Sequence, residues 1–131
     1  MVEINENILI TKKNLEGDEI YRCEVDRYGQ FLFPKWILEI GLVGDPLYVY
    51  IEMIERLETL SIKNNWVDSD GKVYILYGNE EMEETLNKDK ILLNSKNDIK
   101  QSINFLLGKK FILKKEAIDE ENKYFFKAIN L

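Results

Sequence analysis

The stretch DPLYVYIEMIERLETLSIKNN (residues 45–65) decides the fold of this chain. Its apolar residues recur at helical spacing, and its charged residues Glu52, Glu55, Arg56 and Glu58 fall on the other side. An aspartate at position 45 suits a helix N-cap, a proline at 46 suits the first helical turn, and asparagines at 64 and 65 suit its end. The stretch predicts one amphipathic helix of about four to five turns.

The residues after this helix predict a fixed order of further elements. NNWVDSDGKVYILY (64–77) reads as a hairpin that turns at DSDG, because Asp, Ser and Gly favour tight turns. NEEMEETLN (79–87) predicts a short helix capped by Asn79. In SKNDIKQSINFLLG (95–108), Ser95 or Asn97 caps a longer helix that Gly108 ends. FILKKEAI (111–118) and KYFFKAI (123–129) predict two strands joined by the turn DEEN.

The residues before the helix are harder to interpret. ENILITKK (6–13) suits a strand or an irregular arm, LEGDE predicts a turn around Gly17, and residues 20–25 alternate like a strand. In FLFPKWIL (31–38), Pro34 suits the start of a short amphipathic helical turn that contains Trp36. We therefore expect an N-terminal arm or strands in residues 1–30 and a single domain in residues 31–131.

The composition argues against an enzyme. The chain of 131 residues lacks histidine, has the single cysteine Cys23, and contains no glycine-rich phosphate loop. The acidic runs DSDG (68–71) and DEEN (119–122) are ordinary turn sequences rather than metal sites. No apolar run approaches a membrane span, and the N-terminus has no basic leader. We expect a cytoplasmic protein with no catalytic set, cofactor, metal or membrane contact.

Charge is distributed unevenly along the chain. The net charge is −6, but residues 88–115 hold eight lysines and two aspartates, which gives +6 there and −12 elsewhere. Association with a polyanion depends on the local potential, within about 10 Å, more than on the total. A lysine-rich solvated surface is the plainer interpretation of the same residues.

The order of elements favours DNA over that plainer interpretation. A helix, a hairpin, a short helix, a second helix and a two-stranded ribbon define an α+β winged helix-turn-helix, here with an extra N-terminal strand or arm and a C-terminal β-hairpin wing. The second helix is the candidate recognition helix, with Ile99, Ile103, Leu106 and Leu107 inward. Its candidate DNA-reading side chains are Lys96, Asn97, Lys100, Gln101 and Asn104. The candidate phosphate contacts on the wing are Lys109, Lys110, Lys114 and Lys115. The connection KDKILLNSK (88–96) is longer than a usual helix-turn-helix turn, so ILLN (91–94) either extends the short helix or forms a turn of its own.

The middle of the chain resembles the N-terminal domain of the replication initiator A family of Gram-positive plasmids, over roughly residues 28–88. The resemblance is carried by Phe33-Pro34-Lys35-Trp36, Glu55-Arg56, Leu60 to Asp68, Gly71 and Val73-Tyr74. It implies a homodimeric winged-helix domain that binds double-stranded DNA at repeated sites of a plasmid origin, with a host or plasmid protein as a further partner.

Two departures leave other roles open. The chain ends at Leu131, directly after the wing, so it is either a fragment of an initiator or a stand-alone relative. NDIKQSINFLLGKKFI (97–112) also differs from the serine- and threonine-containing helix usual in that family. The alternatives are a DNA-binding accessory protein at a conjugative transfer origin or partition site of a mobile element, and a protein-interaction module. The latter would use the acidic helix Glu52 to Glu58 and exposed Phe31, Phe33 and Trp36.

Overall fold

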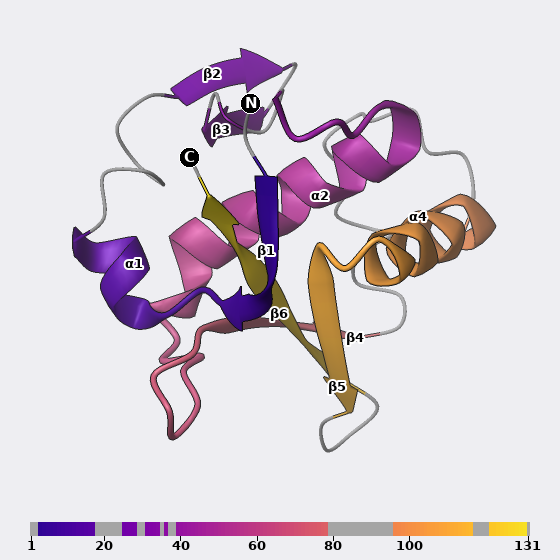
Figure 1. Cartoon of the computed structure of the whole chain (residues 1–131). Coiled ribbons are helices and arrows are strands. Elements are labelled where there is room, and N and C mark those ends of the chain that lie inside the picture. Colours follow the sequence, from indigo (N-terminus) through magenta and orange to yellow (C-terminus); the bar gives the residue numbers. More distant parts are fainter. Residues whose placement is uncertain are drawn as a thin grey trace.

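A computed structural model describes residues 3–17, 25–28, 31–34, 36, 39–78, 96–116 and 121–130 of the chain. The described elements are β1 (Glu3–Leu9), α1 (Lys12–Gly17), β2 (Val25–Tyr28), β3 (Phe31–Pro34), α2 (Gly44–Arg56), η3 (Leu57–Ser61), β4 (Tyr74–Gly78), α4 (Lys96–Gly108), β5 (Ile112–Glu116) and β6 (Glu121–Asn130). Helices α2 and α4 pack against each other and against an antiparallel sheet (Figure 1). The predicted α+β class is confirmed.

The long helix forms as α2 followed directly by η3, over residues 44–61. Its apolar stripe is buried, and Asn65 adopts the predicted left-handed conformation after it, with φ 55°. Two expectations were wrong. The N-cap is Val43 rather than Asp45, which lies in the first turn, where its negative charge favours the helix dipole. Glu52, expected outside, is only 5% exposed, and its Oε1 accepts a hydrogen bond of 3.3 Å from the Tyr77 hydroxyl.

Strand β6 is the centre of the sheet. β4 and β5 lie on its two sides, with Tyr74 opposite Phe125 and Ile112 opposite Phe126. The predicted C-terminal ribbon, β5 paired with β6, is therefore confirmed, and its joining residues 117–120 lie outside the described part. Strand β1 pairs with the far half of β6, as Ile4 opposite Ile129 shows. Because side chains alternate along a strand, Tyr124 and Phe126 face the helices and Phe125 faces away.

The N-terminal region differs from the sequence prediction in two places. The predicted turn around Gly17 is the end of helix α1, which begins after Thr11; the amide and hydroxyl of Thr11 both donate to Asn14 Oδ1, at 2.9 and 3.0 Å. Pro34 ends strand β3 instead of starting a helical turn, and it pairs with Val25 in the β2–β3 hairpin. A proline suits the end of an edge strand because it donates no ladder hydrogen bond. Of the predicted strand 20–25, only Val25 is described, as the first residue of β2.

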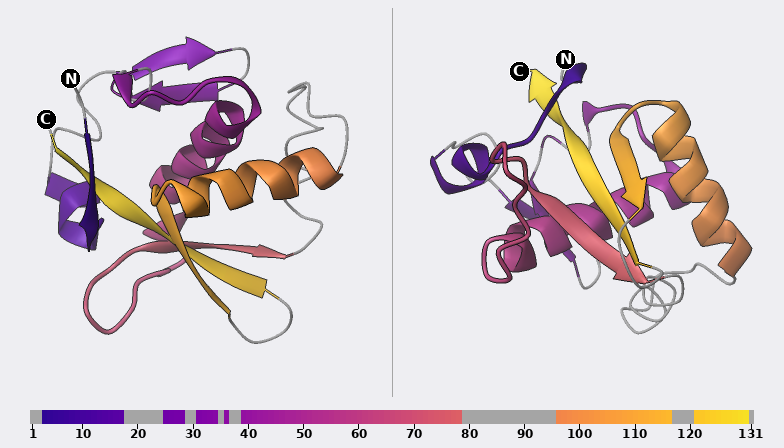
Figure 2. Two further views of the ribbon diagram at one scale, coloured as in Figure 1. Left: turned by 45° about the vertical axis from the view of Figure 1, so that its right-hand side comes forward. Right: turned by 90° about the horizontal axis from the view of Figure 1, so that it is seen from below.

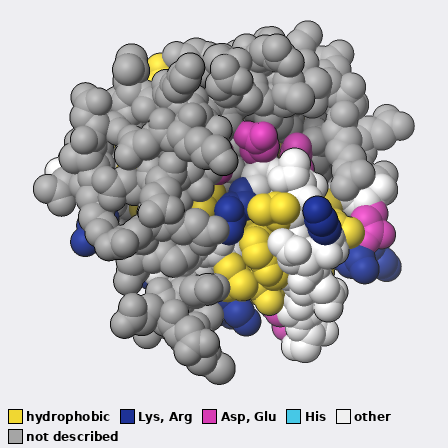
Figure 3. Space-filling view, turned by 180° about the vertical axis from the view of Figure 1, so that it is seen from behind, with side chains coloured by type: hydrophobic (Ala, Val, Ile, Leu, Met, Phe, Trp, Pro, Cys, Tyr) yellow, Lys and Arg dark blue, Asp and Glu magenta, His cyan; other side chains and the backbone are white. Residues whose placement is uncertain are grey.

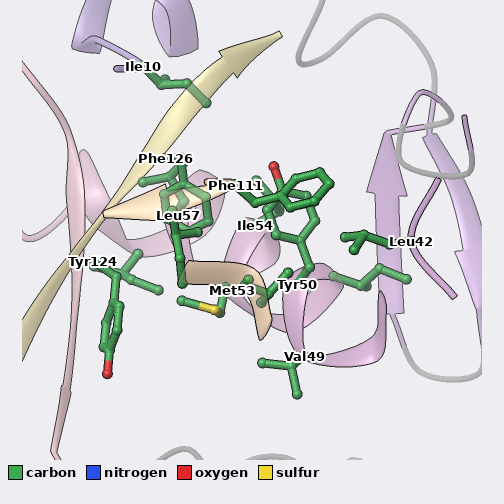
Figure 4. Packing of buried hydrophobic residues seen from close by; sticks show 14 of the residues in the cluster. Ile10, Leu42, Val49, Tyr50, Met53, Ile54, Leu57, Phe111, Tyr124 and Phe126 are labelled. Carbon is green, nitrogen blue, oxygen red and sulfur yellow. The ribbon is translucent and has the colours of Figure 1, made fainter. Parts of the chain in front are cut away.

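Trp36 belongs to the core rather than to an exposed aromatic surface. Its side chain is 6% exposed and its ring meets the Tyr50 ring edge-on, with centroids 6.5 Å apart. Tyr50 in turn packs against Phe111 at 5.6 Å and Phe126 at 6.1 Å, as Figure 4 shows from close by. These aromatic contacts join the segment before α2 to the ribbon that follows α4.

The predicted turn at DSDG is confirmed in detail. Asp68 Oδ1 accepts the amide hydrogens of Asp70 and Lys72, both at 2.9 Å, and Gly71 takes a positive φ of 81° that favours glycine. Val67 and Val73 form a bridge across the turn, and the regular strand begins at Tyr74. The Asp68 carboxylate is therefore used in an Asx turn.

Helix α4 buries the predicted stripe. Ile99 and Leu106 are buried, Ile103 and Leu107 pack against the same core, and Ser102 is buried beside them. Gly108 is the last residue of the helix, as predicted, and Lys110 takes the left-handed conformation two residues later, with φ 64°. The predicted short helix 79–87, its connection 88–95, and so the capping by Ser95, lie outside the described residues.

Candidate nucleic-acid interface

The outward face of α4 carries polar side chains that can reach a ligand. Lys100, Gln101 and Asn104 are exposed, while Ile99 and Leu106 hold the opposite face in the core. Gln101 and Asn104 are three residues apart, so both lie on one side of the helix. α4 lies at the margin of the molecule, beside the ribbon (Figure 2, left). The backbone of Lys96 and Asn97 forms the first turn of α4, and their side chains lie outside the described part.

Phe105 is a candidate that the sequence analysis missed. Its side chain is 44% exposed, and Lys109 Nζ lies 5.9 Å from the centre of its ring. The sequence could have identified it by helical spacing. Ile103 and Leu106 belong to the apolar stripe that faces the core, and position 105 lies outside that stripe. Phe105 is not part of the core, and it is adjacent to Asn104. Its ring is therefore suited to an apolar contact with a base.

The four wing lysines lie in different surroundings. Lys109 approaches Phe105, as above, whereas Lys110 Nζ lies 3.7 Å from Glu6 Oε2 of strand β1. Lys114 and Lys115 are consecutive residues of β5 and therefore point to opposite faces of the sheet. All four are exposed, but the structure does not bring them together as one surface.

The register of the ribbon shows which face of the sheet each of Lys114 and Lys115 lies on. Lys114 is opposite Tyr124, which faces the helices, and burial raises the pKa of the Tyr124 hydroxyl above its ordinary value near 10. Tyr124 is therefore a neutral side chain beneath Lys114 at physiological pH. Lys115 is opposite Lys123 on the other face, and its Nζ lies 5.2 Å from the centre of the Phe125 ring. Only Lys114 of this pair shares the side of the sheet on which α4 packs.

Other kinds of site find little support among the described residues. None of them form a group of three or more cysteine, aspartate or glutamate side chains suited to a metal ion. In the same ranges, no helix is long and apolar enough to cross a membrane. On the face seen from behind, the coloured part of the surface shows separate Lys and Arg side chains between apolar ones, not one continuous basic surface (Figure 3).

Comparison with known proteins identifies the family of the chain. The family model described as "Replication initiator protein A (RepA) N-terminus" matches residues 45–130, from the start of α2 to the end of β6. The chain belongs to this family. The matched segment contains all the elements of the candidate interface, and the resemblance inferred from residues 28–88 is confirmed.

Two solved structures are similar to this replication initiator N-terminal domain. One is titled "N-Terminal domain of DNA binding protein", with 27% identity, a TM-score of 0.56, and coverage of 79% of this chain and 75% of the other. The second, titled "Structure of Rep-DNA complex", has 28% identity, a TM-score of 0.57, and coverage of 77% and 75%. No curated protein sequence matches the chain significantly.

Proposed function

We propose that this initiator domain binds double-stranded DNA at a replication origin of a plasmid or mobile element, as a winged helix-turn-helix with α4 in the major groove. The observation that supports this most is the face of α4 that holds exposed Lys100, Gln101 and Asn104 while the opposite face is fixed in the core. Family membership and the structure titled as a Rep-DNA complex support it independently.

The proposal gives each side chain a role. Gln101 and Asn104, with Asn97, read adenine edges, because the amide nitrogen of each can donate to adenine N7 while its amide oxygen accepts from the N6 amine. Lys96 and Lys100 contact phosphates at the groove edge, and Lys109 and Lys114 contact phosphates beside it. A homodimer would present two α4 helices to half-sites about one helical turn apart.

The rival functions receive less support. A protein-interaction module would have used Trp36 and Glu52 on the surface, and both are buried. A role at a transfer origin or partition site needs the same DNA contacts, but the family match favours replication. Selecting bound fragments from a plasmid library, and mapping whether they come from the origin, separates these DNA-binding roles.

The phosphate contacts can be tested by salt dependence. We expect Lys100→Gln to weaken duplex binding for all sequences and to reduce the slope of log K against log salt by about 0.9, the value for one lost phosphate contact. Fluorescence anisotropy with a labelled duplex at several salt concentrations measures both quantities. The control is Lys13→Gln, an exposed lysine on α1 at the opposite end of the molecule from α4 (Figure 1). Equal slopes for the two variants would contradict the placement of α4 against DNA.

Phe105 can be tested through the methyl group of thymine. Contact of one methyl group with an apolar ring is worth about 0.8 kcal/mol, or roughly fourfold in affinity. We expect the wild-type protein to bind its selected site about fourfold better than the same site with uracil at the contacted thymine. Phe105→Ala should bind both sites equally, and Phe105→Leu should retain part of the preference. A thymine preference that survives in Phe105→Ala would assign the methyl contact to another residue.

A further inference from the structure

The sheet has a lysine-bearing face, opposite the one that packs on the helices. Strand alternation puts Tyr74 and Leu76 of β4, Leu113 and Lys115 of β5, and Lys123, Phe125 and Lys127 of β6 on this face. No described helix covers it, and the view from below shows the strands in front of α2 (Figure 2, right). We call this the open face of the sheet.

Positive charge is concentrated on the open face in an unfavourable arrangement. Lys115 and Lys123 are directly opposite each other on neighbouring strands, a like-charge pair that destabilises a sheet. Lys127 lies four residues after Lys123 on β6, and its Nζ donates to the backbone oxygen of Glu6 at 2.8 Å. Among the side chains of β4, β5 and β6 that the structure describes, none is acidic; the glutamates of these strands, Glu116 and Glu121, stand at strand ends, and their side chains lie outside the described part.

Aromatic rings lie beneath these charges. Lys123 Nζ lies 4.7 Å from the centre of the Tyr74 ring, and Lys115 Nζ lies 5.2 Å from that of Phe125. The two rings are neighbours, with centroids 5.4 Å apart. Phe125 is 2% exposed, whereas Tyr74 is partly exposed, so Tyr74 is the ring that a ligand can reach.

We propose that the open face binds a single strand of DNA, independently of duplex binding by α4. A partly exposed aromatic ring between lysines on a sheet is suited to a nucleobase that stacks while its neighbouring phosphates meet the ammonium groups. A duplex does not fit as well, because its major groove admits a helix or a two-stranded ribbon rather than a sheet face. A stacked base would replace the Lys123 ammonium over Tyr74, and that ammonium would then neutralise a phosphate. Strand separation at an origin supplies such a strand beside the duplex site.

The test measures binding of a labelled twenty-nucleotide thymidine oligomer by fluorescence anisotropy, with duplex binding measured in parallel. We expect Tyr74→Ala to weaken binding of the oligomer about tenfold, because the stacking contact is lost, and Tyr74→Phe to retain it. Lys123→Gln should reduce the salt slope for the oligomer by about 0.7. Both Tyr74→Ala and Lys123→Gln should bind the duplex within about twofold of wild type, as expected when duplex contacts lie elsewhere.

The matched control is Lys114→Gln, on the same strand as Lys115 but on the helix side of the sheet. It should weaken duplex binding and leave binding of the oligomer unchanged. The proposal is overturned if wild-type protein does not bind the oligomer, if Tyr74→Ala and Lys123→Gln bind it like wild type, or if both variants lose duplex binding equally. Circular dichroism of each variant confirms its fold, and Lys123→Gln decides the outcome alone if Tyr74→Ala unfolds. If the wild-type protein does not bind the duplex, that result counts against the proposed function of α4 and not against the open face.

Discussion

Replacing Gln101 and Asn104 together by alanine is expected to abolish sequence-specific binding while leaving the non-specific affinity for duplex DNA largely intact. Both side chains are exposed on one side of α4. One bidentate contact between an amide and adenine discriminates against the wrong base by about 1–3 kcal/mol, so two contacts predict a loss of roughly 30-fold to 10⁴-fold on the selected site. Random-sequence duplexes should bind within about threefold of wild type, because their affinity depends on phosphate contacts.

The loss of specificity should be confined to the base pairs that the two amides contact. For wild type, changing a contacted A·T pair to G·C costs affinity, whereas the double variant should be indifferent to the same change. Competition titrations against a panel of single-base substitutions, measured at one fixed salt concentration, give this profile. Lys100→Gln is the comparison, since it should weaken every member of the panel by a similar factor. If the alanine variant keeps the wild-type profile at reduced affinity, then α4 does not read bases through these amides.

Elements that depend on local periodicity could be predicted from the sequence. The stripe from Leu47 to Leu60 predicted the long helix, and the alternation around Ile112 and Tyr124 predicted the ribbon. The turn at Asp68 was also predictable, because its carboxylate bonds to amides only two and four residues away. In each case the interactions that decide the structure lie within a few residues along the chain.

Features that depend on distant residues could not be predicted. Glu52 looks like an outer residue of an amphipathic helix, but Tyr77, 25 residues later, supplies a hydroxyl that permits its burial. The ion pair of Lys110 with Glu6 joins residues from opposite ends of the chain, so nothing near Lys110 in the sequence indicates it. The consecutive lysines 114 and 115 appear as one cluster in sequence, and only the strand conformation assigns them to opposite faces.

The motif that carried the family resemblance is mostly structural rather than DNA-reading. Trp36 is a core residue, Asn65 takes a left-handed conformation, and Asp68 and Gly71 build the turn. The candidate DNA contacts lie further along, on α4.

Arg56 is the motif residue whose removal should cost the most stability. Its Nε and Nη2 both donate to the backbone oxygen of Leu76, at 3.2 and 3.0 Å, and so join the end of α2 to the edge strand β4. Its guanidinium carbon also lies 4.3 Å from the centre of the Tyr77 ring and 5.4 Å from that of Trp66. One side chain therefore connects a helix, a strand and the turn between them.

Arg56→Ala is expected to reduce the free energy of unfolding by about 3–4 kcal/mol, since it removes charge-assisted hydrogen bonds worth roughly 1.5–3 kcal/mol and cation–π contacts worth about 0.5–2 kcal/mol. Arg56→Lys should lose less, because an ammonium keeps the charge but cannot donate in the same planar fork. Urea unfolding followed by circular dichroism measures both, with exposed Lys63→Ala as a control expected within about 0.5 kcal/mol of wild type.

A loss below about 1 kcal/mol for Arg56→Ala would show that other contacts hold β4 to α2. If the folded variant still binds duplex DNA like wild type, Arg56 acts on stability alone; lost binding in a fully folded protein would place it in recognition instead.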